Sequence, residues 1–264
     1  MFSPISKVIQ TFGKAAQNYH QEADLQRRVA KGLIASLIPW KGAIPPGPIL
    51  EVGAGTGLLT ADLIREFPNR TIIVSDASPQ MLDYCKAQLT EQELPLSDIK
   101  FKHLDVNDYK AYTPEYGLII SNFAAHWFKD PSLGLQNLSR ALLPGGIMLG
   151  SFPGNHSFPK WYEYCLELGI PHTANPLPDV EEVAVKLSME DMQIDYYEND
   201  LYQEFDSSLN FFRHLKSIGS STSTLDKSLS HKQFKLLVNH WDNKSEGKVN
   251  IKWHVVYLAA KKGS

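Results

Sequence analysis

The 264-residue chain has few cysteines, no hydrophobic run of membrane-spanning length and no large excess of one charge. Its two cysteines, Cys85 and Cys165, lie far apart and outside any Cys-x-x-Cys spacing, which argues against a disulfide framework and a thiolate metal site. Residues 1–7 and the polar stretch 17–28 that comes after them lack the apolar core of a signal peptide. These absences predict a cytoplasmic protein with reduced thiols and no membrane partner.

Charge and histidine content exclude further classes of protein. Lys and Arg number 26 and Asp and Glu 29, so the formal net charge of −3 lacks the positive excess on which general nucleic-acid binders depend. Hydrophobic residues make up 43% and charged residues 21%, which excludes disordered, collagen-like and coiled-coil chains. The nine histidines are scattered without paired spacing, so we expect no metal site and structural or surface roles for His126, His172 and His214.

Short apolar runs alternate with helical patterns through the middle of the chain, which indicates a parallel sheet covered by helices on both faces. Strands are predicted over residues 49–52, 71–75, 99–103, 116–121, 147–152, 192–205 and 250–260. Helices are predicted as a pair within 6–38 that breaks near 18–21, and over 58–67, 79–89, 133–142, 161–168 and 209–218. The strand–helix alternation stops after residue 152, so we expect a cap inserted late in the chain.

Three glycines lie between the first predicted strand and the helix that follows it. In the segment Glu51-Val52-Gly53-Ala54-Gly55-Thr56-Gly57 the missing side chains let a flat or anionic ligand approach the backbone and the helix N-terminus. Leu58 stands where the dinucleotide fingerprint has its third glycine, which disfavours a dehydrogenase. The segment has no Gly-Lys-Ser or Gly-Lys-Thr, which excludes a Walker-type ATPase or kinase.

Polar residues follow the later strands as well. Asp76 ends the second strand, where its carboxylate is placed to accept hydrogen bonds from both hydroxyls of a ribose. Asp105 follows the third strand and is placed to hold an adenine amino group, while Val106 packs against the ring. Asn122 lies at the end of the fourth predicted strand. Because the carboxyl ends of parallel strands meet at one edge of a sheet, we expect these side chains to converge on one ligand.

These motifs, together with the turn Leu143-Pro144-Gly145-Gly146 before a strand, resemble those of class I S-adenosylmethionine-dependent methyltransferases over residues 49–152. The resemblance implies a Rossmann-like α/β fold with a doubly wound, mostly parallel seven-stranded sheet, and S-adenosyl-L-methionine as cofactor. It places Glu51 at the amino-acid end of that cofactor. The cofactor-binding residues that it implies are Gln26, Glu51, Gly53, Ala54, Gly55, Asp76, Ala77, Met81, Asp105, Val106 and Asn122.

The flanks resemble a narrower family, the malonyl-[acyl-carrier protein] O-methyltransferases of biotin synthesis. The segments that carry this resemblance are 8–19, 23–27, 121–127, 212–219 and 253–258. It implies methyl transfer to the free carboxylate of a malonyl thioester, carried by acyl carrier protein or by coenzyme A. A carboxylate is ionised near neutral pH and needs no general base, so alignment and removal of water would supply the catalysis.

The same resemblance divides the chain into lid helices (1–40), a cofactor-binding core (48–152), a cap and substrate region (153–247) and a closing strand and tail (248–264). Two residues are expected to be catalytic. Tyr19 would lie in the lid and donate its hydroxyl to the cofactor or the acceptor; its alternative is a half-buried aromatic that closes the helix pair. Arg213 would hold the acceptor carboxylate bidentately. The substrate pocket is expected to include Phe123, Trp127 and Lys216.

Other readings of the sequence stay open. An acidic carrier protein would dock on a basic face, whose candidates, if they are not ordinary surface charges, are Arg27, Arg28, Lys31, Lys216, Lys232 and Lys235. The acceptor could instead be another small acid resembling trans-aconitate, or a quinone precursor, which would require a base that we do not find. A third alternative is a module that binds S-adenosylmethionine without transferring its methyl group.

Overall fold

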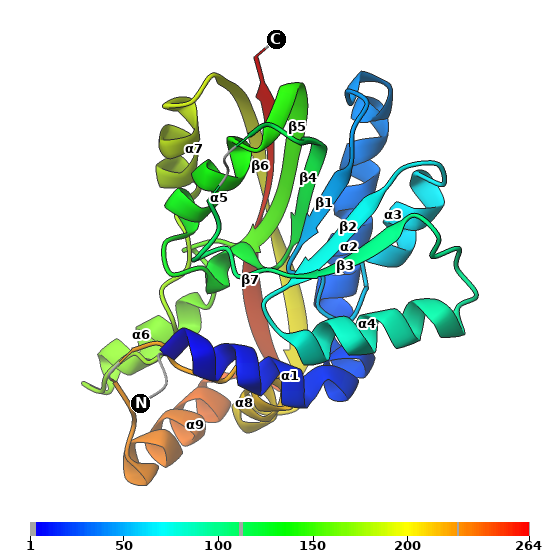
Figure 1. Ribbon diagram of the computed structural model, residues 1–264. Coiled ribbons are helices and arrows are strands. Elements are labelled where there is room, and N and C mark those ends of the chain that lie inside the picture. The colour runs from blue at the N-terminus through cyan, green and yellow to red at the C-terminus, as the bar shows by residue number, and fades with distance from the viewer. Residues whose placement is uncertain (1–3, 111–112, 226, 264) are drawn as a thin grey trace.

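The computed structural model describes residues 4–110, 113–225 and 227–263 (Figure 1). In this part of the chain one sheet contains seven strands in the order β3-β2-β1-β4-β5-β7-β6. The pairs among β1 to β5 are parallel, whereas β7 is antiparallel to both β5 and β6. The predicted doubly wound, mostly parallel seven-stranded fold is confirmed. Residues 1–3 of the predicted lid lie outside the described residues.

The bounds of the elements follow the sequence patterns closely over most of the chain. The strands are β1 Ile49–Val52, β2 Ile72–Asp76, β3 Ile99–His103, β4 Tyr116–Asn122, β5 Leu142–Pro153, β6 Met192–Phe205 and β7 Val249–Lys262. The helices are α1 Pro4–Glu22, α2 Asp24–Leu37, α3 Thr60–Glu66, α4 Pro79–Glu91, α5 Pro131–Ser139, α6 Pro159–Glu167, α7 Val180–Ser188, α8 Ser208–Ser217 and α9 His231–Lys244, with short 3-10 turns η1 Ile38–Ala43 and η2 Ala125–Trp127.

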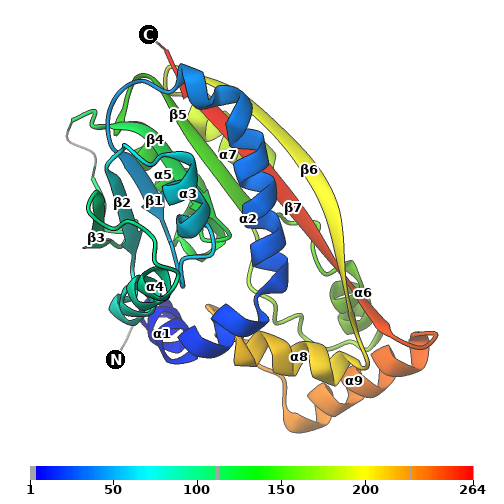
Figure 2. The same ribbon diagram turned by 90° about the vertical axis from the view of Figure 1, so that its right-hand side faces the viewer.

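Helices cover both faces of the sheet, with α2 and α3 on one side and α5 and α7 on the other (Figure 2). The central strands are therefore buried on both faces, as the continuous apolar run at residues 118–120 of β4 predicts. Consecutive strand residues point to opposite faces, so Ile49 packs with the helices of one side and Leu50 with those of the other. Burial of these two faces supplies the main stabilisation of the fold.

The antiparallel strands β6 and β7 form a long strand pair that extends beyond the parallel strands. They pair over their whole length, from Met192 opposite Lys262 to Phe205 opposite Val249, although α8 and α9 lie between them in the sequence. Helices α6, α8 and α9 gather at the extended end of this strand pair, and α1 lies across the same end of the molecule (Figures 1 and 2). The range 153–247 thus contributes a sheet strand as well as the helices beside the cavity described below.

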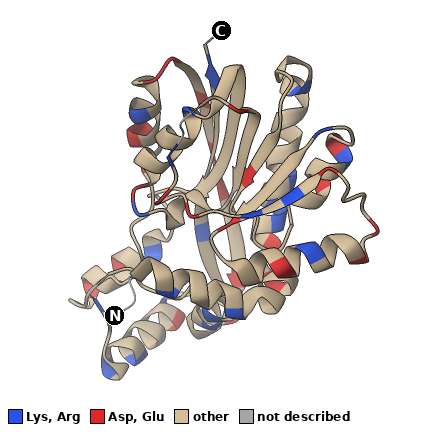
Figure 3. Ribbon diagram, viewed as in Figure 1, with Lys and Arg blue, Asp and Glu red and all other residues tan. Residues whose placement is uncertain are grey.

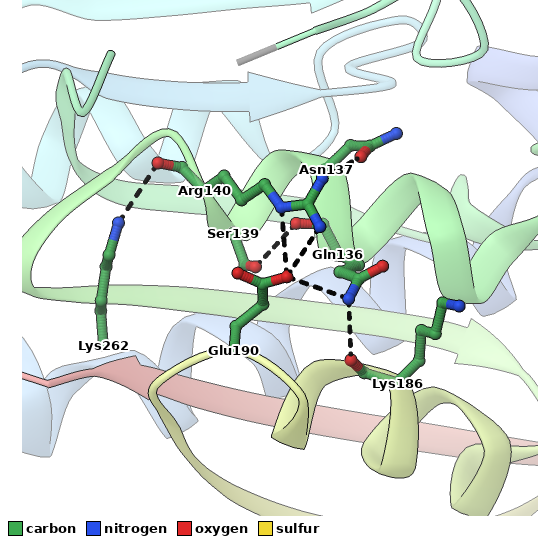
Figure 4. Close-up of polar contacts among 7 residues, drawn as sticks. All are labelled: Gln136, Asn137, Ser139, Arg140, Lys186, Glu190 and Lys262. Atoms are coloured by element: carbon green, nitrogen blue, oxygen red, sulfur yellow. Dashed lines mark hydrogen bonds and ion pairs between the residues drawn. The ribbon is translucent and has the colours of Figure 1, made fainter. Parts of the chain in front are cut away.

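A polar cluster joins α5 to the end of α7 (Figure 4). Oε1 of Glu190 accepts hydrogen bonds from Nη2 of Arg140 at 2.8 Å and from Nε2 of Gln136 at 3.0 Å. Gln136 also donates to the carbonyl of Lys186 at 3.3 Å, and Nζ of Lys262 donates to the carbonyl of Arg140 at 3.2 Å. The cluster thereby holds together α5 and α7, the two helices that cover one face of the sheet.

Three local expectations from the sequence are corrected. The helices α7 and α9 were not predicted, because α7 is short and follows a Pro-rich segment, and α9 is largely polar and buries only Leu237 and Trp241. The helix predicted over 133–142 ends at Ser139, since Leu142 already pairs with Tyr116 as part of β5. The turn at Gly145 lies within β5 as an irregularity of that pairing and does not precede the strand.

No helix in the described ranges is long and apolar enough to cross a membrane. This finding agrees with the hydropathy pattern of the sequence.

Candidate active site

A cavity of about 470 Å³ lies at the carboxyl ends of β1, β2 and β4, and α1 contributes to its wall. The strand order places β1 between β2 and β4, so the connections after β1 and β4 leave the sheet to opposite sides and open a crevice there. This is the point at which the sequence predicts convergence. The strand-end residues that line the cavity are Gly53, Gly55, Asp76, Asp105, Asn122 and Phe123.

The glycine turn after β1 forms the floor of the cavity. Gly53 and Gly55 have φ angles of +69° and +56°, a region that side chains disfavour. A Cβ on Gly53 would overlap the Cβ of Ala124, whereas a Cβ on Gly55 would lie 3.7 Å from Cε1 of Tyr19. The amide of Ala54 donates to the carbonyl of Ser75 at 2.9 Å, which ties the turn to β2. The backbone is therefore fixed where a ligand can approach it closely.

Asp76 is held in place by backbone donors. Its Oδ2 accepts a hydrogen bond from the amide of Gly55 at 2.9 Å, and its Oδ1 accepts one from the amide of Ser78 at 2.7 Å. Burial raises the pKa of Asp76, and these hydrogen bonds oppose the rise. Each carboxylate oxygen keeps a further lone pair, so Asp76 can accept two more donors from a ligand in the cavity.

Two buried acceptors near this floor lack a donor among the described residues. Oε2 of Glu51 has none, and the residue is 1% exposed in the middle of the sheet. Oε1 of Gln26, on α2, has none either, although Gln26 lines the cavity. Burial raises the pKa of Glu51 to about 8, and a hydrogen bond from Thr60 opposes the rise. Unpaired buried acceptors are costly, so both oxygens indicate a ligand that brings N–H groups.

Glu51 and Ala54 face a separate small hollow of about 10 Å³ instead of the main cavity. Asn122 borders both spaces, and each of its polar atoms makes one hydrogen bond to the protein. Its Nδ2 donates to the carbonyl of Gln26 at 3.1 Å, and its Oδ1 accepts from the hydroxyl of Ser151 at 2.8 Å. In the structure Asn122 therefore joins α2 to β4 and β5 and positions the unpaired Gln26 side chain.

Tyr19 projects from α1 into the cavity beside the glycine turn. Its ring meets Phe12 edge-on, with centroids 6.0 Å apart. Burial, and after it the negative charge of Asp76, raises the pKa of the Tyr19 hydroxyl, while Arg27 opposes the rise. The hydroxyl is thus a protonated hydrogen-bond donor throughout the physiological pH range. A protonated hydroxyl is what the predicted role of Tyr19, donation to the cofactor or the acceptor, requires.

Aromatic rings form the part of the cavity farther from the glycine turn. Phe12 packs edge-on against Trp127 with centroids 5.1 Å apart, and Phe158 packs against Trp253 at 4.6 Å. Phe123 and Phe158 have positive φ angles of 53° and 60°, which are uncommon for bulky residues and occur mostly where surrounding structure enforces them. Both rings line the cavity, so this backbone strain is located in its wall.

The structure places most of the residues predicted from sequence in the wall of the main cavity. Those that line it are Tyr19, Gln26, Gly53, Gly55, Asp76, Ala77, Met81, Asp105, Val106, Asn122, Phe123 and Trp127. Sequence reasoning missed several further wall residues. They are Phe158, Trp161, Phe234 and Lys227, whose loops and short helices carry no periodic signal that would place them at the cavity.

Arg213 and Lys216 are corrections, because both lie outside the cavity wall and are exposed to solvent. The helix α8 buries Phe211 and Leu215, and Phe212 and Leu215 line the cavity. Arg213 follows Phe211 by two positions, which is about 200° around a helix, so it points away from the buried face. The structure thus places Arg213 outside the wall of the cavity, on the solvent side of α8.

The wall of the cavity contains a histidine, His126. Burial lowers the pKa of His126 to about 3, so this cavity residue is neutral near physiological pH. Within residues 4–110, 113–225 and 227–263 no group of three His, Cys, Asp or Glu side chains is arranged to hold a metal ion. What the site offers is a rigid backbone floor, buried acceptors and an apolar chamber beside them.

This strand order, with a glycine turn after β1 and an acid at the end of β2, defines the class I methyltransferase fold. Solved structures share it: the YcgJ protein from Bacillus subtilis aligns with a TM-score of 0.62 at 14% identity, over 89% of this chain and 99% of that one. An N-methyltransferase from Haemonchus contortus, solved with S-adenosylhomocysteine, aligns with a TM-score of 0.51 at 16% identity, over 87% of this chain and 53% of that one. Residues 49–146 match a family model described as a methyltransferase domain.

Sequence relatives define the family more narrowly. The malonyl-[acyl-carrier protein] O-methyltransferase of Magnetococcus marinus is 30% identical over 215 residues, which cover 81% of this chain and 77% of the relative. Its counterpart from Priestia megaterium is 28% identical, and 92% of each chain is covered. The biotin biosynthesis bifunctional protein of Bordetella avium is 32% identical over 83% of this chain and 45% of its own length. The chain belongs to this family of S-adenosylmethionine-dependent methyltransferases.

Proposed function

We propose that the protein transfers the methyl group of S-adenosyl-L-methionine to the free carboxylate of a malonyl thioester, malonyl-acyl carrier protein or malonyl-coenzyme A, in biotin synthesis. One observation carries the proposal: similarity to a relative named for this reaction covers 92% of the chain, far beyond the matched domain at 49–146. The similarity therefore includes most of the elements that carry the aromatic rings of the cavity wall. The predicted cytoplasmic location is part of the same proposal.

The residues of the floor fit the proposed cofactor, which supplies a methyl group on a positively charged sulfur. The unpaired Oε2 of Glu51 and Oε1 of Gln26 would accept from its ammonium group. Asp76, whose backbone partners fix its orientation, would accept from the ribose hydroxyls. Asp105 and Val106 would hold and cover the adenine ring at the next strand end.

The chamber beside this floor suits an acceptor that is already ionised. A malonyl carboxylate needs no base near neutral pH, and the neutral His126 is not required to supply one. The chain therefore has to align the carboxylate and remove water from it. The rings of Phe12, Trp127 and Phe158 provide the water-excluding wall, and Tyr19 provides a hydroxyl donor between the chamber and the glycine turn.

The raised pKa of Glu51 predicts a pH-dependent cofactor affinity. Below pH 8 the carboxyl is mostly protonated, whereas an ammonium group pairs with the ionised form, so binding of S-adenosylhomocysteine should strengthen as pH rises from 6.0 to 7.5. The expected change is about tenfold per pH unit. Isothermal titration calorimetry measures the affinity for S-adenosylhomocysteine at each pH. Glu51→Gln should bind more weakly with a flat pH profile.

The matched control for this prediction is methylthioadenosine, which lacks the amino-acid end and should bind wild-type protein with little pH dependence. An equal slope for both ligands would assign the titration to a group other than Glu51.

An acidic carrier protein would dock beside the cavity on exposed lysines of α9, two of the residues that the sequence suggests for this role. Figure 3 shows Lys and Arg recurring on the helices at this end of the molecule. Reversing both Lys232 and Lys235 to Glu is expected to lower kcat/KM about tenfold for malonyl carrier protein and less than twofold for malonyl-coenzyme A. The control reverses Lys100 and Lys102, which are exposed on β3 at the far edge of the sheet. Equal losses with both substrates would remove the docking role.

The chemical nature of the product tests the reaction itself. After incubation with labelled S-adenosylmethionine and malonyl carrier protein, the label should be released as methanol by mild alkali, because a methyl ester is hydrolysed under these conditions. Label that resists alkali would show transfer to carbon or nitrogen and would reject carboxylate methylation.

A further inference from the structure

The charges in the cavity wall are distributed unevenly. Asp76 and Asp105 lie at the strand ends, on the side of the glycine turn. Among the described residues, Lys227 is the only Lys or Arg in the wall, and it comes from the loop between α8 and α9. It has no ion pair or hydrogen bond within the described ranges, and it is exposed, so its ammonium group is available at the outer end of the cavity.

The surroundings of Lys227 are held in place by hydrogen bonds between three segments. The hydroxyl of Thr222 donates to that of Thr11 on α1 at 3.0 Å. Nδ2 of Asn175 donates to the carbonyl of Thr222 at 3.0 Å, and Oδ1 of Asn175 accepts from the amide of Thr224 at 2.8 Å. Thr222 and Thr224 thereby join the loop between α8 and α9, of which residues 219–225 and 227–230 are described, to α1 and to the segment 171–178 at the edge of the cavity.

The side chains around this edge are neutral and rich in donors. The wall residues of these two segments that carry a hydroxyl or amide group are Thr173, Asn175, Ser220, Ser221, Thr222, Ser223 and Ser228. Burial, and after it the positive charge of Lys227, lowers the pKa of His172, whose ring lies 5.4 Å from that of Trp161 in the wall. Within the described part of the wall, one cation without an ion pair lies among neutral donors, and this is the chemistry of an anion site.

We infer that Lys227 and the hydroxyl-rich edge bind the phosphate of the pantetheine arm that carries the acyl group. This inference rests on the proposed function. The acceptor carboxylate has to reach the floor of the cavity, where Gln26, Asp76 and Asp105 lie, and its attacking oxygen must stay unpaired. The arm extends outward from it along Phe158, Phe212 and Phe234, so its phosphate reaches the cation at the outer end. Lysine binds phosphate as a point charge and needs no bidentate geometry.

A binding experiment tests the subsite without requiring methyl transfer. Titration calorimetry of the protein saturated with S-adenosylhomocysteine should show that 4′-phosphopantetheine binds about tenfold more tightly than pantetheine. Lys227→Gln should abolish this difference, and high salt should reduce it. Lys248→Gln, which changes an exposed lysine outside the wall, should preserve it. Equal affinities in the wild-type protein, or an undiminished difference in Lys227→Gln, would overturn the inference.

Turnover then distinguishes the source of the phosphate. In Lys227→Gln, kcat/KM should fall about tenfold with malonyl carrier protein, with malonyl-coenzyme A, or with both, and the substrate affected identifies the arm that is held. Malonyl-pantetheine, which has no phosphate, should be used as well by Lys227→Gln as by wild type. An equal fall with malonyl-pantetheine would place Lys227 at the acyl carboxylate and reject the subsite. If no malonyl thioester is methylated, the proposed function fails while the calorimetric result still decides the phosphate subsite.

Discussion

Replacement of Asp76 by alanine is expected to weaken binding of S-adenosylhomocysteine by about 100-fold or more. Hydrogen bonds to a charged group contribute about 1.5–3 kcal/mol each, and the carboxylate is placed to accept two from a ribose. Its orientation is fixed by hydrogen bonds from the amides of Gly55 and Ser78. Titration calorimetry measures the change. Asp76→Asn, which keeps one acceptor and loses the charge, should lie between wild type and Asp76→Ala.

The control for charge removal is Asp83→Ala, which changes an exposed carboxylate on the neighbouring helix α4 and should leave the affinity within twofold. Circular dichroism checks that the variants fold, because loss of Asp76 also leaves two backbone amides without their acceptor. A folded Asp76→Ala protein with wild-type affinity would move the cofactor away from the end of β2.

Tyr19→Phe is expected to lower kcat/KM for methyl transfer by about 100-fold while the affinity for S-adenosylhomocysteine changes by less than fivefold. The substitution keeps the ring against Phe12 and the glycine turn and removes only the hydroxyl donor. A misplaced reactant costs a factor of this size when alignment is the main source of catalysis. Single-turnover kinetics with saturating cofactor measure the effect on transfer.

Tyr162→Phe is the matched control, because Tyr162 is an exposed tyrosine on α6 that does not line the cavity. Its activity should equal that of wild type. If Tyr19→Phe is equally active, Tyr19 serves only as an aromatic ring that closes the helix pair, which is the alternative that the sequence leaves open.

The floor of the site was predictable from sequence because local rules determine it. A strand followed by Gly53 and Gly55, and a strand that ends in Asp76, fix both backbone conformation and position at the sheet edge. The alternation of strands and helices predicted the parallel part of the sheet, and β3 and β6 have the predicted bounds. In these segments the hydrophobic pattern and the turn chemistry favour the same structure.

The outer part of the cavity was not predictable in the same way. Arg213 fits the family segment in sequence, but the position of α8 directs its neighbours Phe212 and Leu215 toward the cavity and Arg213 toward solvent. Lys227 lies in a polar loop without periodicity, and contacts between Thr222, Thr11 and Asn175, distant in sequence, bring that loop to the cavity edge. Such positions depend on tertiary packing, which local patterns do not encode.

The central claim is that the protein methylates the free carboxylate of a malonyl thioester. The most direct measurement is transfer of labelled methyl from S-adenosylmethionine to malonyl carrier protein, compared with acetyl carrier protein and with free trans-aconitate. Because acetyl carrier protein has the same arm and lacks the carboxylate, we predict label on the malonyl form alone. Label on trans-aconitate without label on malonyl carrier protein, or cofactor binding without transfer to any of the three, would contradict the claim.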